Sequence, residues 1–228
     1  MGTIQSFLEH MNWFQLVILL MGALASLFCL TFHELSHGLT AYRLGDPTAK
    51  INGRLTLNPI AHIDLVGLFL MLVARVGWAK PVPVDMRNFK NPKRDMAITA
   101  LAGPLSNFVL SFLALGICSI VYHAVPSGTV SAYAILFFSY MAVLSVGLGL
   151  FNLIPIPPLD GSKVLFSLLP DKVYLTILKY ERFLIVAVVL LAWSGFFGGP
   201  LDAAMEGVTG LLCRLVGFPF EILEYYFF

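Results

Sequence analysis

Long runs of apolar residues constrain this chain of 228 residues more than any other feature. A helix needs about 20 mostly apolar residues to cross a lipid bilayer. Three stretches reach that length, at residues 12–44, 97–125 and 130–153. In the whole chain 58% of the residues are apolar and 12% are charged, against about 25% charged in an average soluble protein. The sequence therefore predicts an all-α polytopic membrane protein embedded in a lipid bilayer.

The apolar stretches toward the C-terminus are shorter or interrupted. Residues 183–197 form a fourth candidate span. The tail at 203–228 contains four interrupting residues: Arg214, Pro219, Glu221 and Glu224. The tail therefore either crosses the bilayer or lies on its surface. No linker or repeat divides the chain, so we expect one domain over residues 1–228, with a three-helix core at about 12–170 and one or two helices at about 171–228.

Positively charged residues gather in two short intervals. Of the 14 Lys and Arg residues, nine lie between positions 43 and 94 and four between 163 and 182. Basic residues near the ends of spans favour the cytoplasmic side of a membrane. We therefore expect both intervals on that side and the N-terminus outside. A net charge of +1 gives no general attraction to polyanions, so no nucleic-acid partner is expected.

Residues 65–79 are apolar, but they are few for a span and include Arg75. A crossing there would place half of the first basic interval outside, whereas a segment that dips in and returns keeps both intervals on one side. We therefore expect a short re-entrant, β-hairpin-like segment. Irregular backbone is tolerated at membrane depth where it lines a wet cavity. The segment thus also points to a cavity.

The first span contains His33-Glu34-Leu35-Ser36-His37, an HExxH pattern. Histidines at i and i+4 lie on one helical face and can bind one Zn²⁺, with Glu34 placed as a general base. Ionisable groups in mid-span cost about 2.5–3.5 kcal/mol on insertion scales, so they mark functional sites. The alternative is a polar cluster that reaches the membrane surface. His33 lies 11 residues, about 16 Å, from the helix end, which favours one Zn²⁺ per chain.

A catalytic zinc usually has three protein ligands and one open position. No Glu lies between Glu34 and Glu181. The candidates for the third ligand are therefore Asp46, His62, Asp64 and Asp160. Asp46 lies in a Gly-Asp-Pro turn signature. Asp160 follows the third span, where prolines break the helix and Gly161 permits a sharp turn, so it is either a ligand on the inner side or the N-cap of the next short helix.

Three motifs together resemble the site-2 protease family of intramembrane zinc metalloproteases. They are HELSH at 33–37, Gly-Pro-Leu-Ser-Asn at 103–107 and Asn-Leu-Ile-Pro-Ile-Pro-Pro-Leu-Asp-Gly at 152–161. The stretch Gly-Trp-Ala-Lys-Pro-Val-Pro-Val at 77–84 is similar to the short prokaryotic members without PDZ or CBS domains. The resemblance implies that the zinc ligands are His33, His37 and Asp160.

The resemblance also implies the activity. Glu34 would be the catalytic base and Asn152 would bind substrate, because both match the family's motifs. The family cleaves transmembrane helices of other proteins in regulated intramembrane proteolysis, so the expected partners are transmembrane protein substrates. The expected location is a prokaryotic cell (inner) membrane, with the active site nearer the cytoplasmic side. The alternatives are a catalytically inactive membrane scaffold and a metal or ion transporter.

The segment that follows the re-entrant residues alternates proline with valine. Pro81 and Pro83 lack backbone N–H groups, so the donors left are those of Val82 and Val84. Such an edge suits strand addition, and we predict that it clamps an extended substrate. A plain rigid turn is the alternative.

Three polar residues have open roles. Asn107 lies in mid-span, where it either bonds across helices as a structural contact or orients substrate or Asp160. His62 and Asp64 either support the metal ligands or gate the site, or they belong to a loop at the membrane surface.

Overall fold

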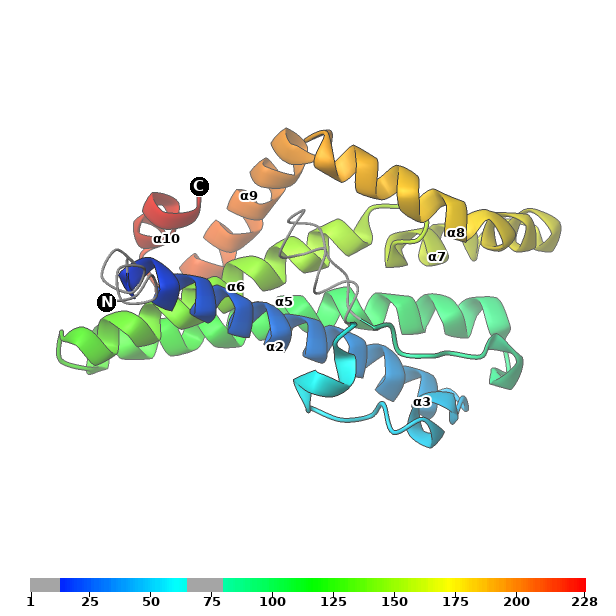
Figure 1. Cartoon of the computed structure of the whole chain (residues 1–228), viewed down its shortest axis with the longest axis horizontal. Helices are drawn as coiled ribbons and strands as arrows, with labels where there is room; N and C mark the ends of the chain where they lie inside the picture. Colours follow the sequence, from blue (N-terminus) through cyan, green and yellow to red (C-terminus); the bar gives the residue numbers. More distant parts are fainter. Residues whose placement is uncertain (1–12, 65–79) are drawn as a thin grey trace, which may run out of the picture.

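The computed structural model describes residues 13–64 and 80–228. Its centre consists of three long helices, α2 (Trp13–Arg43), α5 (Pro92–Ala124) and α6 (Thr129–Leu153). All three are long and apolar enough to cross a membrane, and they pack side by side as a bundle (Figure 1). The three predicted long spans are therefore confirmed. The second begins earlier than predicted, at Pro92, because proline suits the first turn of a helix.

Small side chains allow the three helices to approach closely. The buried core includes Cys29 of α2, Ala114 and Cys118 of α5, and Ala142 of α6. Inside a membrane, helix association depends on close packing and on polar contacts between helices. Both occur here, since the buried Ser145 hydroxyl of α6 lies 3.3 Å from the Cys29 thiol of α2. This packing fixes the rotation of α2 against its neighbours.

The helices that follow the core are bent rather than continuous. α8 (Asp171–Trp193) and α9 (Gly198–Val216) meet at 80°, and Gly195 in the turn between them has a positive φ. The predicted span at 183–197 therefore ends earlier than expected, at Trp193, because the chain turns there. Taken together, these two helices are long and apolar enough to form one further, broken span or a re-entrant loop.

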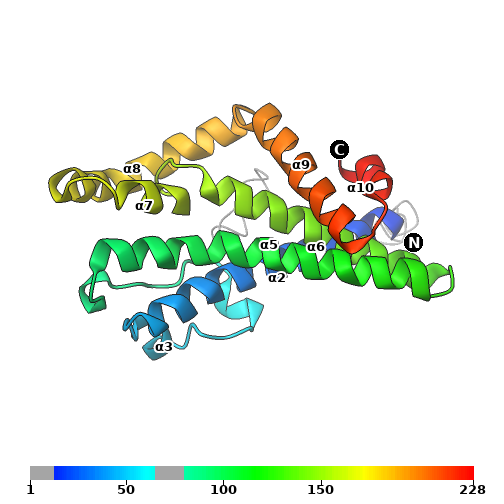
Figure 2. The same ribbon diagram turned by 180° about the vertical axis from the view of Figure 1, so that it is seen from behind.

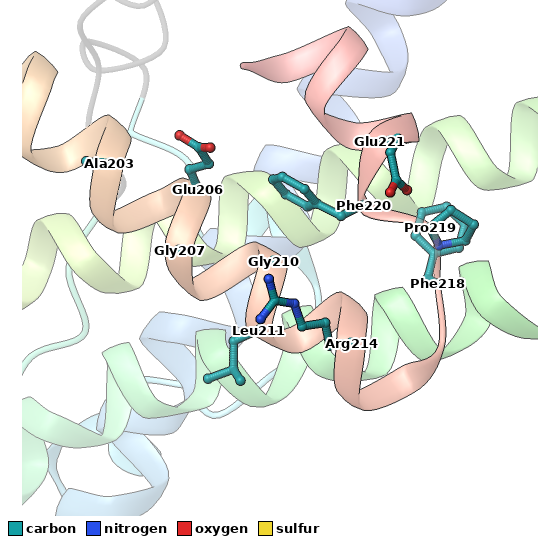
Figure 3. Close-up of a pocket in the computed structure, with 10 residues that line it drawn as sticks. All are labelled: Ala203, Glu206, Gly207, Gly210, Leu211, Arg214, Phe218, Pro219, Phe220 and Glu221. Carbon is teal, nitrogen blue, oxygen red and sulfur yellow. The ribbon is translucent and has the colours of Figure 1, made fainter.

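The apolar tail at 203–228 is not one straight span. It consists of most of α9, which packs on α6 and α5, and of α10 (Phe220–Phe227). The left-handed residue Gly217 ends α9 and turns the chain back. A cavity of about 720 Å³ lies between α9 and α10, and Figure 3 shows its lining.

Four short elements join the long helices. They are α3 (Thr48–Ile51), η1 (Pro59–His62), η2 (Met86–Asn88) and α7 (Asp160–Phe166). Figure 1 and Figure 2 both show α3 and α7 toward the end of the molecule away from α10. The predicted re-entrant segment at 65–79 lies outside the described residues. Directly after it, residues 80–85 form an extended segment that is not part of a β-sheet. Of the short elements, α3 and η1 pack on α2, whereas η2 and α7 pack on α5.

Candidate metal centre

Two histidines of α2 face the same side of the helix, one turn apart. His33 is 4% exposed and His37 is half-buried. Their Nε2 atoms lie 3.0 Å apart, and their rings meet edge to face. The i, i+4 spacing of the HExxH pattern therefore brings two imidazole nitrogens to one point, as predicted.

Asp160 is the acidic residue that the fold brings to this pair. Its Oδ2 lies 3.2 Å from His33 Nε2 and 3.1 Å from His37 Nε2. Asp160 is the first residue of α7, not its N-cap, so the alternative role is wrong. A Cβ on Gly161 would overlap the Leu153 carbonyl, so only glycine lets α7 start so close to the end of α6.

The second nitrogen of each ring has its own partner on α5. His37 Nδ1 lies 2.7 Å from the Thr99 carbonyl oxygen, which can only accept, so Nδ1 carries the proton. His33 Nδ1 lies 3.2 Å from the Asn107 side-chain amide, whose Oδ1 otherwise lacks a partner. Turning that amide over lets Oδ1 accept from His33 Nδ1–H, and amide orientation is an assignment rather than an observation. Both Nε2 atoms are then free of protons.

The three converging atoms are therefore all hydrogen-bond acceptors. With these tautomers, two neutral Nε2 atoms and a carboxylate oxygen converge at 3.0–3.2 Å, an arrangement that a cation among them would stabilise. Ligands of a tetrahedral zinc at 2.0–2.1 Å are about 3.3 Å apart. Among the described residues, this is the one cluster of three or more His, Cys, Asp or Glu that could hold a metal. The donor set and its spacing fit Zn²⁺.

Gly103 of α5 makes room for the two imidazoles. A Cβ at this position would overlap the His37 ring and lie 2.7 Å from Cε1 of His33. Thr99, Gly103 and Asn107 are four residues apart, so they share one face of α5. This face supplies two hydrogen-bond partners and the space between them.

The charge around Asp160 keeps the acid ionised. Burial alone raises the pKa of its carboxyl, but the two neighbouring histidines and the Lys163 ammonium outweigh burial and hold the pKa below its ordinary range. Lys163 Nζ lies 3.4 Å from Asp160 Oδ1, on the side away from the histidines. A metal ion at the cluster would act in the same direction.

Glu34 lies beside the cluster in a cavity of about 330 Å³. Its Oε2 accepts a hydrogen bond of 2.8 Å from the backbone N–H of Val82. The lining comprises His33, Glu34, His37, Pro81, Val82, Val84, Met96, Thr99, Ala100, Asn152, Pro158, Asp160 and Lys163. Asn152, Val82 and Val84 thus lie at the cavity, where the sequence predicts substrate contacts. The N–H of Val82 is directed at Glu34, so it is not free to pair with a substrate strand.

The remaining predicted residues lie elsewhere. Asn107 contacts His33 and is not itself among the residues that line the cavity. His62 is buried on η1, where its Nε2 lies 3.0 Å from the Thr56 carbonyl oxygen. His62 and Asp64 do not line the cavity as far as the structure describes it. Asp46, another candidate ligand, accepts hydrogen bonds from residues 48, 85 and 88 instead.

Comparison with known proteins agrees with this geometry. The profile of "Peptidase family M50" matches residues 116–193, a range that includes Asn152 and Asp160. "Putative zinc metalloprotease YwhC" of Bacillus subtilis is 41% identical over 164 residues, which are 71% of this chain and 74% of that protein. This chain belongs to peptidase family M50. The family M50 zinc metalloproteases are the site-2 proteases, so the metal of this chain is Zn²⁺, and the cluster of two histidines and Asp160 could bind it.

Two mycobacterial members of family M50 are also similar. "Putative zinc metalloprotease Rip2" of Mycobacterium tuberculosis is 30% identical over 205 residues, 88% of this chain and 74% of that protein. The protein of the same name from Mycolicibacterium smegmatis is 34% identical over 171 residues, 72% of this chain and 64% of its own length. No solved structure matches the chain.

Three residues that support the His33, His37 and Asp160 cluster were not predicted from the sequence. Thr99 holds His37, Gly103 leaves space for both rings, and Lys163 contacts Asp160. A usable signal is present for the first two, because small or polar residues recur every four positions at 99, 103 and 107 in an otherwise apolar helix. Lys163 has the weaker signal of lying three residues after Asp160 on a short helix.

Proposed function

We propose that this membrane metalloprotease cuts peptide bonds in or near the transmembrane helices of other membrane proteins, as part of regulated intramembrane proteolysis. The observation that carries the proposal is the place of the cluster. His33 lies ten residues before Arg43, the last residue of α2, which corresponds to about 15 Å along the helix. A hydrolytic site at that depth acts on chain segments that enter the membrane.

In this proposal His33, His37 and Asp160 hold one zinc, and Glu34 is the catalytic base. Zinc supplies an acidified water and a Lewis acid for the scissile carbonyl. Glu34 takes the proton from the attacking water and returns it to the leaving amine. The Val82 N–H bond of 2.8 Å fixes the orientation of the Glu34 carboxylate for both transfers. Asn107 and Thr99 keep the imidazole rings in the tautomer that ligates through Nε2.

The substrate is extended where it is cut. Carbonyl groups in a helix are engaged in hydrogen bonds one turn away, so the helix must open near the scissile bond. Asn152, Val82 and Val84 line the cavity and are the proposed substrate contacts. Val84 retains a backbone N–H for strand addition, whereas that of Val82 contacts Glu34. His62 and Asp64 are proposed to support the loop under this segment, since the Lys80 N–H donates to the His62 carbonyl oxygen at 2.9 Å.

The proposed orientation places the N-terminus outside and the metal centre nearer the cytoplasmic side of a prokaryotic cell (inner) membrane. The distribution of basic residues supports it, because 13 of the 14 lie in the two intervals 43–94 and 163–182. The described parts of both intervals lie at the α3 and α7 end of the bundle, opposite α10 (Figure 1).

The test is Glu34→Gln in the full chain reconstituted in lipid vesicles with a single-span peptide substrate. The variant should retain one zinc per chain by elemental analysis but lose at least about 100-fold in cleavage, the lower end of general acid–base contributions. A Gly pair in the substrate span should speed cleavage by the wild type, since glycine weakens a helix. Zinc binding by the wild type without cleavage, or cleavage that survives Glu34→Gln, would contradict the proposal and favour a scaffold or a transporter.

A further inference from the structure

Two buried charged residues outside the metal centre hold the extended segment that crosses Glu34. We call this segment, Lys80–Asp85, the strap. Asp46 is 0% exposed and Arg54 is 8% exposed. A buried charge needs partners that offset its desolvation, and here most partners are backbone groups of the strap and its neighbours.

Asp46 holds the C-terminal end of the strap. Its Oδ2 accepts the backbone N–H of Asp85 at 2.8 Å. Its Oδ1 accepts the Asn88 side-chain amide at 2.7 Å and both the N–H and the hydroxyl of Thr48. Burial raises the pKa of Asp46, but these four donors outweigh it and leave the pKa below its ordinary value. Asp46 is therefore an ionised carboxylate with both oxygens in use.

Arg54 holds the N-terminal end. Its Nη2 donates to the Lys80 carbonyl oxygen at 2.6 Å and to that of Pro81 at 3.3 Å, and its Nη1 donates to the Ala61 carbonyl oxygen. The fixed fork of a guanidinium suits several carbonyl groups at once. Both ends of the strap are thus fixed to the loops that follow α2.

The middle of the strap touches the reacting group. Val82 donates its N–H to Glu34 Oε2 at 2.8 Å, and its side chain is 8% exposed. Its Cγ1 lies 3.1 Å from where a Cβ on Gly38 would be, so the strap packs directly on α2. Prolines on both sides of Val82 limit its backbone freedom. Because the strap is stiff, displacing one of its ends would also displace the Val82 N–H.

We propose that Asp46 is a positioning residue of the hydrolytic site, which acts through the strap to keep the Val82 N–H on Glu34. The inference rests on the proposed role of Glu34 as base. Asp46 contacts neither the metal ligands nor the cavity lining. Asp46 is connected to the reacting group through the backbone of four residues, from Asp85 to Val82.

The experiment compares Asp46→Asn with Asp202→Asn in the full chain in lipid vesicles. An amide at 46 keeps its oxygen toward the three donors on Oδ1, so its NH₂ faces the Asp85 N–H and that bond is lost. Asp202→Asn, the matched control, makes the same chemical change at an exposed position of α9, outside the strap. The readouts are backbone amide exchange in peptides covering 80–88, kcat and KM for a single-span peptide, and bound zinc.

For Asp46→Asn we expect amide exchange in 80–88 at least about tenfold faster and kcat about tenfold lower, as for loss of one charge-assisted hydrogen bond. KM should stay within about twofold, and zinc at one per chain, because substrate contacts and ligands are intact. Asp202→Asn should match the wild type. Unchanged exchange, an equal kcat loss in both variants, or zinc loss would overturn the inference.

The two proposals fail differently in this experiment. Cleavage that survives Glu34→Gln contradicts the proposed function, while the exchange of 80–88 still reports whether Asp46 holds the strap. If Asp46→Asn does not fold, Arg54→Lys tests the other end of the strap, since one ammonium cannot replace the fork. It should give the same faster exchange and lower kcat, and wild-type values would overturn the inference.

Discussion

The two cavities of this protein differ in a way that size does not predict. The cavity between α9 and α10, about 720 Å³, is larger than the metal cavity of about 330 Å³. Its charged residues are exposed, and Figure 3 shows Glu206, Arg214 and Glu221 well apart from one another. In the smaller cavity three ligand atoms lie within 4.8 Å of one another. The smaller cavity is therefore distinguished by the convergence of two oriented imidazoles and a carboxylate, and not by its volume.

The largest effect should come from removing a ligand. Asp160→Ala leaves the two Nε2 atoms with only one another, so zinc affinity should fall by more than about 100-fold, beyond the usual loss from an outer partner. Competition with a chelator of known affinity measures the change. The matched control is Asp46→Asn, which should keep its zinc. If Asp160→Ala and the wild type bound zinc equally tightly, the convergence of these three side chains would not distinguish the smaller cavity from the larger one.

A smaller but still large effect is expected at Gly103. The methyl group of Gly103→Ala would overlap the His37 ring, so the imidazoles must shift and zinc affinity should fall by up to about 100-fold. Gly116→Ala on the same helix is the control, because a Cβ there has no neighbour within 4 Å. The same chelator titration applies. If Gly103→Ala bound zinc as tightly as the wild type, α5 would not determine the positions of the two imidazole rings.

Asn107→Leu tests the orientation of His33. Without the Oδ1 acceptor the ring can turn or change tautomer, so zinc affinity should fall about tenfold. Ser111→Ala, one turn along α5 at an equally buried position, should leave the affinity unchanged. If both variants behave alike, Asn107 is only a contact between helices.

The smallest effect should come from the larger cavity. Arg214→Gln and Glu221→Gln change its charges at exposed positions, so zinc affinity and kcat should stay within about twofold of the wild type. The assays are the chelator titration and cleavage of the single-span peptide. A tenfold change in either would mean that the two cavities are coupled, and the contrast between them would then be too simple.

The sequence predicted the features that depend on composition and local spacing. Hydropathy located the three long spans, and the HExxH pattern gave His33 and His37, since both depend only on helix periodicity. Asp160 was one of four candidates, and choosing it required the fold. The resemblance to site-2 proteases pointed to it, and the geometry agrees.

The features that were missed depend on contacts between distant segments. The partner of Asn107 follows from the rotation of α5 against α2, and the bond from Val82 to Glu34 follows from the path of the strap. No local pattern determines either contact. The turn at Gly195 was missed because an apolar run continues through it, and hydropathy does not distinguish a straight helix from a bent one.

The division of the metal centre between two helices has a consequence for the membrane around it. The ligands His33 and His37 belong to α2, while Thr99, Gly103 and Asn107, which hold or accommodate their rings, belong to α5. A shift of one residue along the helix axis, about 1.5 Å, would misplace all three supports together. Zinc affinity therefore serves as a gauge of helix alignment, and bilayers of different thickness should be distinguishable by how firmly this protein retains its metal.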